Sequence, residues 1–222
     1  MNARTLHDWA ETVALFERRV LPESSYGNLY DESYEVHPGP LVIQGLLDLN
    51  EEDWSSAGGV VVDGDLTVEG NILNVDDGCP ALVVLGDLKA ADVYLEGDAK
   101  LIVAGNVTVN AFIGNMTDKL VMIHGDLKAA VTVLSAEFSP DLIGGILHGA
   151  VVAPDYLDLA QDVDPATLLV AEVLCADSDD DPDDMRCFDA PRVHGGRLLR
   201  RVEEGLPVVL ASPSSHGNAT GG

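Results

Sequence analysis

The stretch Leu82-Val83-Val84-Leu85-Gly86-Asp87-Leu88-Lys89-Ala90 decides the fold of this chain, because it joins an apolar run, a glycine and a second apolar run. The same pattern occurs six times between Leu41 and Leu147. Its glycines are Gly45, Gly64, Gly86, Gly105, Gly125 and Gly145, spaced by 19, 22, 19, 20 and 20 residues. A period of about 20 residues is typical of a solenoid, in which each repeat is stable only when stacked on its neighbours.

Each repeat also carries short apolar segments after its glycine, such as Leu88–Ala90 and then Val93–Leu95. Three β-rich segments per turn, bent at glycines that tolerate positive φ, predict a mainly β fold. We expect a parallel β-helix of about six rungs, a rung being one turn of the solenoid. Aligned on the glycines, the first strands of the rungs are Leu41–Ile43, Val60–Val62, Leu82–Val84, Leu101–Val103, Val121–Ile123 and Asp141–Ile143.

When rungs stack in register, equivalent residues of successive rungs become neighbours and form a column along the solenoid. One predicted column is exposed and alternates threonine with lysine, which keeps like charges apart: Thr67, Lys89, Thr108 and Lys128. A second column directly follows the glycines: Asp65, Asp87, Asn106 and Asp126. Its side chains either bond to backbone amides at a corner of the solenoid or form a negative edge that meets a cationic partner.

The repeat divides the chain into four predicted regions. Residues 1–40 hold an amphipathic helix, with Thr5 as its N-cap, and a loop rich in tyrosines and acids, which together cap the rod. Residues 41–152 form the β-helix, and residues 153–210 form a C-terminal mixed and helical cap with an acidic loop. Its last helix is expected from Gly196 to about Glu204, and residues 211–222 are expected to be a disordered tail.

The composition points to a basic partner. Thirty-eight Asp and Glu residues against 12 Lys and Arg residues give a formal net charge of −26. This charge repels nucleic acids and anionic lipids and attracts basic proteins. The sequence has no signal-peptide pattern and no long apolar span, and its three cysteines are an odd number without metal-ligand spacing. We therefore expect a cytoplasmic protein that binds neither nucleic acid nor membrane.

The common catalytic motifs are absent from the sequence. It contains no phosphate-binding GxxxxGK[ST] loop, no GxSxG or HExxH motif and no CxxC pair. His124 and His148 fall one rung apart but in different columns, so a shared metal site is not expected. The aspartate run near residue 180 lacks the glycine and terminal glutamate of an EF-hand loop. We therefore predict neither catalytic residues, nor a metal, nor a cofactor.

The glycine-centred rungs, such as Leu82–Ala90 and Leu101–Val109, resemble those of the bactofilin-type, polymer-forming β-helix proteins of bacteria. The resemblance covers Leu41 to Ala150, about half the chain. It implies a scaffold whose rods join end to end, but the predicted caps depart from that pattern because capped ends cannot stack. Bactofilin-like β-helices are also similar to some small proteins encoded beside interbacterial toxins, where an acidic protein neutralises a basic toxin.

The leading hypothesis is a non-enzymatic immunity protein that blocks the active site of a basic bacterial toxin, such as a nuclease. It is expected to be monomeric apart from that complex. Two surfaces are the candidate partner-binding residues. The first is the tyrosine and acid loop with Tyr26, Tyr30, Asp31, Tyr34 and Glu35, and the second is the aspartate loop with Asp177, Asp179, Asp180, Asp181, Asp183 and Asp184. A self-assembling bactofilin-like cytoskeletal scaffold and a carbohydrate-active or acyl-transfer β-helix enzyme remain the alternatives.

Overall fold

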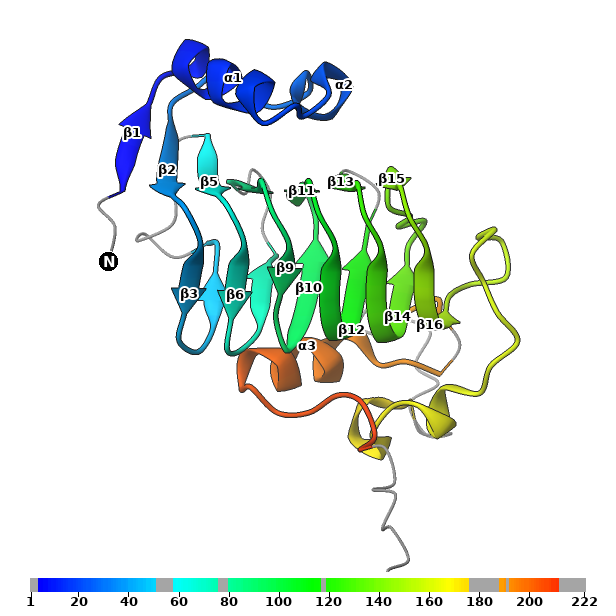
Figure 1. The fold of residues 1–222 in the computed structure, drawn as a ribbon. Helices are drawn as coiled ribbons and strands as arrows, with labels where there is room; N and C mark the ends of the chain where they lie inside the picture. The colour runs from blue at the N-terminus through cyan, green and yellow to red at the C-terminus, as the bar shows by residue number, and fades with distance from the viewer. Residues whose placement is uncertain are drawn as a thin grey trace, which may run out of the picture.

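A computed structural model describes residues 4–50, 58–75, 80–116, 119–175, 188–190 and 192–211, and it shows the expected parallel β-solenoid (Figure 1). The described strands stack in three rows, which we call faces 1, 2 and 3. Face 1 consists of β2 (Tyr34–Pro38), β5 (Gly59–Asp63), β8 (Ala81–Val84), β11 (Lys100–Val103), β13 (Leu120–Ile123) and β15 (Leu142–Ile143), all parallel.

Faces 2 and 3 complete each rung. Face 2 holds β3 (Leu41–Ile43), β6 (Leu66–Val68) and β9 (Leu88–Lys89), and face 3 holds β4 (Leu47–Asp48), β7 (Ile72–Asn74) and β10 (Asp92–Glu96). In later rungs a single bent strand spans both faces: β12 (Val107–Asn115), β14 (Leu127–Ser135) and β16 (Leu147–Val152). Four central rungs, which begin with β5, β8, β11 and β13, are paired on both sides, and shorter rungs flank them instead of six equal ones.

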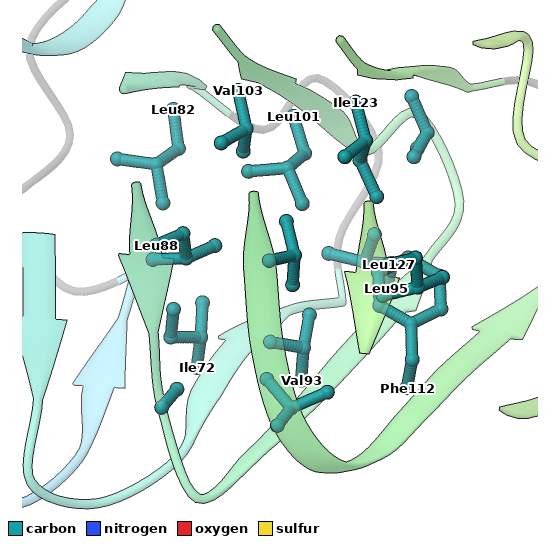
Figure 2. Packing of buried hydrophobic residues seen from close by; sticks show 14 of the residues in the cluster. Ile72, Leu82, Leu88, Val93, Leu95, Leu101, Val103, Phe112, Ile123 and Leu127 are labelled. Carbon is teal, nitrogen blue, oxygen red and sulfur yellow. The ribbon is translucent and has the colours of Figure 1, made fainter. Parts of the chain in front are cut away.

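The interior of the solenoid is filled by aliphatic residues from all three faces (Figure 2). Leu82, Leu101 and Val103 point inward from face 1 and meet Leu88 and Leu127 from face 2. Small β-branched and leucine side chains suit this narrow space, because each inward position repeats every rung with little change of volume.

The predicted register is wrong in the first rung. Leu41–Ile43 pairs with β6 on face 2 rather than with β5, and the first strand of face 1 is Tyr34–Pro38. Gly39, not Gly45, lies beneath Gly64, where an added Cβ would come within 2.9 Å of the Gly39 carbonyl carbon. The first repeat is 25 residues long, as the pairing of Tyr34 with Gly59 shows. The 19-residue step from Gly45 to Gly64 was therefore a coincidence of spacing.

The N-terminal segment has its helices along the outer side of face 1, while its strand extends that face at the end of the rod (Figure 1). It comprises β1 (Thr5–His7), α1 (Trp9–Arg18) and α2 (Glu23–Tyr26). Thr5 is not the N-cap, because residues 5–7 form a strand antiparallel to β2. Asp8 caps α1 instead, in a reciprocal capping box with Glu11. The buried side of α1 covers outward-facing apolar residues of face 1.

The C-terminal segment covers the outer side of face 3. It contains two short 3-10 helices, η1 (Pro165–Thr167) and η2 (Ala171–Val173), and the helix α3 (Gly195–Glu203), which begins one residue before the expected position. Leu198 and Val202 of α3 pack on outward residues of face 3, including Tyr94 and Ile113. We call the described residues of this segment, 165–175, 188–190 and 192–210, the C-terminal cover. The two flanking segments thus shield faces 1 and 3.

Candidate functional site

The predicted tyrosine and acid loop is partly folded into the core of the protein. Tyr34 belongs to β2 and is fully buried, and its hydroxyl donates to the Tyr30 carbonyl oxygen at 3.0 Å. Tyr26 is also buried, and its ring lies 5.2 Å from the Phe16 ring and 6.4 Å from the Trp9 ring, measured between centroids. Burial raises the pKa of both tyrosines. Tyr26 and Tyr34 therefore anchor the N-terminal segment and present no contact surface to a partner.

Glu35 closes the N-terminal end of the solenoid. It occupies an inward position of β2, in register with Val60. Its Oε1 atom lies 3.1 Å from an Arg4 guanidinium nitrogen and 3.0 Å from Nε2 of His37. Polar side chains in the first rung thus replace the aliphatic residues of later rungs. Glu35 is engaged within the molecule rather than free for a partner.

Tyr30 and Asp31 are the members of this loop that reach the surface. Tyr30 is 48% exposed, and its hydroxyl donates to Oδ2 of Asp98 at 3.2 Å. The Lys100 ammonium lies 4.7 Å from the centre of the Tyr30 ring and 2.6 Å from Oδ2 of Asp98. Asp31 and Glu32 are exposed beside it. The ring is therefore held in place at a surface where the carboxylates of Asp31, Glu32 and Asp98 outnumber the Lys100 ammonium.

The aspartates of the second predicted surface, from Asp177 to Asp184, lie outside the described residues. The structure does describe the chain on both sides of them. Leu174 and Val193 form an antiparallel bridge, so the flanking chain is held together at this point. Asp189 accepts hydrogen bonds from the Ser135 hydroxyl, the Ala136 amide and the Tyr156 hydroxyl. Burial opposes ionisation of Asp189, but these bonds outweigh it and lower its pKa.

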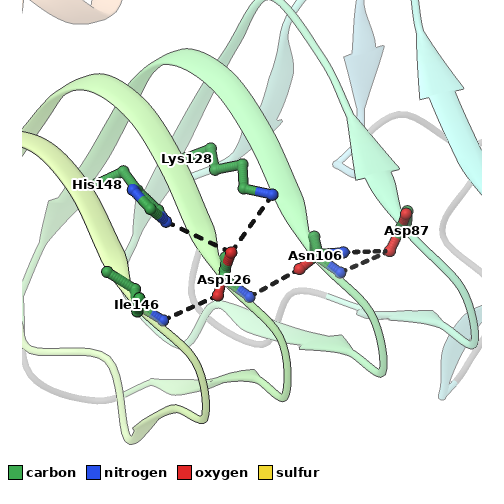
Figure 3. Close-up of polar contacts among 6 residues, drawn as sticks. All are labelled: Asp87, Asn106, Asp126, Lys128, Ile146 and His148. Carbon is green, nitrogen blue, oxygen red and sulfur yellow. Dashed lines mark hydrogen bonds and ion pairs between the residues drawn. The ribbon is translucent and has the colours of Figure 1, made fainter.

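The column of Asp65, Asp87, Asn106 and Asp126 forms a ladder between rungs, as Figure 3 shows for its last three members. Each Oδ1 atom accepts from the amide of the equivalent residue one rung later, at 2.9, 2.7, 2.9 and 3.0 Å in that order. The expectation of bonds to backbone amides is confirmed, although the amides belong to the next rung. The bond from the Ile146 amide is the main cause that lowers the pKa of Asp126.

The exposed threonine and lysine column is also confirmed. Thr67, Lys89, Thr108 and Lys128 lie in register along face 2, with His148 after them. The Lys128 ammonium lies 3.3 Å from Oδ2 of Asp126 (Figure 3). The outer side of face 2 therefore carries lysine and histidine side chains beside the aspartates of the ladder.

A second ladder, missed in the sequence, runs along the corner between faces 2 and 3. Oδ1 of Asn71 accepts from the Asp92 amide at 3.0 Å, and Oδ1 of Asp92 accepts from the Ala111 amide at 2.9 Å. Both side chains are almost fully buried, at 3% and 4% exposure. Ala111 follows Asn71 and Asp92 in this column, so the sequence shows no repeating polar pattern that predicts the ladder. Burial raises the pKa of Asp92 to about 6.

A serine and histidine pair joins α2 to the solenoid. The Ser25 hydroxyl oxygen lies 2.9 Å from Nε2 of His124, and burial lowers the pKa of His124. Ser25 is 1% exposed, so its oxygen is shielded from any substrate. In the part of the chain that the structure describes, no group of three or more potential ligands could hold a metal ion. The pair is a tether for the N-terminal segment.

None of the protein-family models, curated proteins or solved structures compared with this chain matches it. Among the described residues, no helix has both the length and the apolar character needed to span a membrane. The family resemblance of the rungs therefore stays an interpretation of the sequence.

Proposed function

We propose that this chain is a non-enzymatic acidic binding protein, an immunity protein that neutralises a basic bacterial toxin by covering its active site. The observation that carries the proposal is the net charge of −26. Such a charge opposes self-association and accelerates the capture of a positively charged partner. A nuclease is a fitting target, because a cleft that binds phosphates also accepts carboxylates. We further propose that the protein acts in the cytoplasm, where it meets the toxin before export.

The surface around Tyr30 supports this proposal. Its ring is half exposed and fixed by contacts with Asp98 and Lys100, so little side-chain entropy is lost when a partner packs on it. The neighbouring carboxylates of Asp31 and Glu32 are exposed. Long-range attraction to the carboxylates speeds the formation of a complex, and an aromatic side chain packed at its centre slows its dissociation.

A self-assembling scaffold is the second candidate, and one feature favours it. Within the described part of the chain, β15 pairs only with β13 and β16 only with β14, so their outer edges could accept another strand. The interior, however, is closed at this end by Leu157, Leu159 and Ala160, which pack against the core. A second copy could stack there only after displacing them. The binding role therefore fits the geometry better.

Coexpression tests the proposal. The chain is produced together with each toxic protein encoded beside its own gene, and growth and complex formation are measured. We expect the chain to protect the cells by forming a complex whose association rate falls steeply with salt. In a variant with Asp31→Asn and Glu32→Gln, that association rate should fall by a few-fold. The matched control carries Asp155→Asn and Asp158→Asn, two exposed acids beyond β16, and should retain more of the rate. If no adjacent product is toxic, or toxicity persists beside the folded protein, the proposal fails.

A further inference from the structure

Asp92 lies in a chain of hydrogen bonds that links the solenoid to the C-terminal cover. Its Oδ1 atom accepts from the Ala111 amide at 2.9 Å, and its own amide donates to Oδ1 of Asn71 at 3.0 Å. Nδ2 of Asn71 then donates to the carbonyl oxygen of Val202 at 2.7 Å. Val202 belongs to the last turn of α3, which packs against β10 (Figure 1). The buried side chain of Asp92 therefore lies one rung away from Asn71, the residue that binds the last turn of α3.

The surroundings of Asp92 disfavour its negative charge. Its side chain is 4% exposed, and none of the described cations forms an ion pair with it. The neighbouring titratable groups are Tyr94 and Glu96 on β10, which share a hydrogen bond of 2.6 Å, and Glu203 on α3, whose charge acts on Tyr94.

The basic residues near the end of α3 do not offset that charge. Arg201 donates from Nε to the Pro207 carbonyl oxygen, and Arg200 is exposed. The carboxyl end of a helix carries partial negative charge, which repels a nearby carboxylate. The Asp92 carboxyl group is thus buried with a hydrogen bond from the Ala111 amide but without an ion pair among the described residues.

We propose that Asp92 is a proton-controlled latch, which holds the C-terminal cover on face 3 more tightly when its carboxyl group is protonated than when it is ionised. Burial of the carboxylate has a cost that is recovered when the cover opens and water reaches Asp92. Protonation removes that cost, so the closed state gains stability on acidification. The latch acts on α3 because Asn71 hydrogen-bonds both to the Asp92 amide and to the Val202 carbonyl oxygen in the last turn of that helix.

Release of the cover would uncover an apolar surface. Tyr94, Ile113 and Val133 face outward on face 3 and are buried by the cover. An exposed strip of this kind is a contact site for another protein. The latch therefore makes this contact surface more accessible at neutral pH than at acidic pH. This inference does not depend on the proposed immunity role.

Hydrogen exchange of the full chain at pH 5 and pH 7.5, corrected for intrinsic exchange rates, tests the latch. The opening equilibrium is measured for the amides of α3 and of the interior strand β11. With a pKa of about 6 when buried and 3.8 when open, the opening constant of α3 should rise about tenfold between these pH values. The amides of β11 should change much less, because the cover opens before the solenoid unfolds.

Two variants separate the latch from a general effect of pH. Asp92→Asn keeps the acceptor for the Ala111 amide and should make the opening constant of α3 equal at the two pH values. Asp126→Asn makes the same chemical change in the exposed ladder and should leave the tenfold response intact. A pH-independent opening of α3 in the unmodified chain would overturn the proposal without any variant. So would an undiminished response in folded Asp92→Asn.

Discussion

Thr132→Val should stabilise this protein, although it removes a polar hydroxyl group. Thr132 lies on β14 in register with Phe112 and Val151, which belong to the interior cluster, and it is 1% exposed. Its hydroxyl has no hydrogen-bond partner in the described structure. A buried hydroxyl without a partner costs about 1–3 kcal/mol, and valine replaces it with a methyl group of nearly the same shape. We expect the free energy of unfolding to rise by about 1–2 kcal/mol.

Urea and thermal unfolding measure this change, with the midpoint of melting expected to rise by about 2–8 °C. Thr108→Val is the matched control, because Thr108 is exposed on face 2 and in register with Lys89 and Lys128. It should alter the unfolding free energy by less than about 0.5 kcal/mol. If Thr132→Val left stability unchanged or lowered it, either the hydroxyl would have an internal partner or Thr132 would not face the interior.

Three further predictions follow from the fold and its buried groups. Val103→Asp should unfold the protein, because an unpaired charge in the interior costs several kcal/mol. The control Thr108→Asp, which lies between two lysines, should fold. Circular dichroism distinguishes the two variants, and a folded Val103→Asp would contradict the register. Gly105→Asn should lower the free energy of unfolding by about 3 kcal/mol, because its Cβ would meet the Gly86 carbonyl oxygen at 2.7 Å. Gly45→Asn, at φ +78° in open space, should lower it by less than about 1 kcal/mol. Equal shifts of the melting midpoint would refute the corrected alignment. The folded state holds the Asp92 proton up to a pKa of about 6 and the unfolded state only to about 3.8. Asp92 therefore makes the free energy of unfolding fall by about 3 kcal/mol as pH rises from well below 3.8 to well above 6. Asp92→Asn should flatten that part of the stability profile, and an unchanged slope would exclude Asp92 as its source.

The sequence predicted the features that repeat and missed those that occur once. The interior aliphatic positions and the Thr67 to Lys128 column recur in every rung, so stacking alone places them correctly. The first rung was misaligned because its 25-residue repeat departs from the period, and Gly45 offered a regular spacing by chance. Periodicity could not foresee that α1 lies along face 1, because an amphipathic helix shows only that one side is buried, not what buries it.

The candidate site shows the same limit. Tyr30 and Tyr34 lie four residues apart in one polar segment, yet one is 48% exposed and the other fully buried. The difference arises because Tyr34 belongs to the first strand of face 1, where α1 covers it, whereas Tyr30 precedes that strand. Only the long-range contact with α1 decides which tyrosine can meet a partner. The buried ladder of Asn71 and Asp92 is equally invisible, since its partners lie one rung away.

The central claim is that this chain acts as a closed, acidic monomer on a basic partner. Sedimentation velocity at about 0.15 M salt tests it most directly, first on the pure protein and then on an equimolar mixture with the adjacent-gene toxin. We predict a single species of 23.5 kDa alone and a one-to-one complex in the mixture. Rapidly sedimenting filaments of the pure protein, or two independent species in the mixture, would contradict the claim.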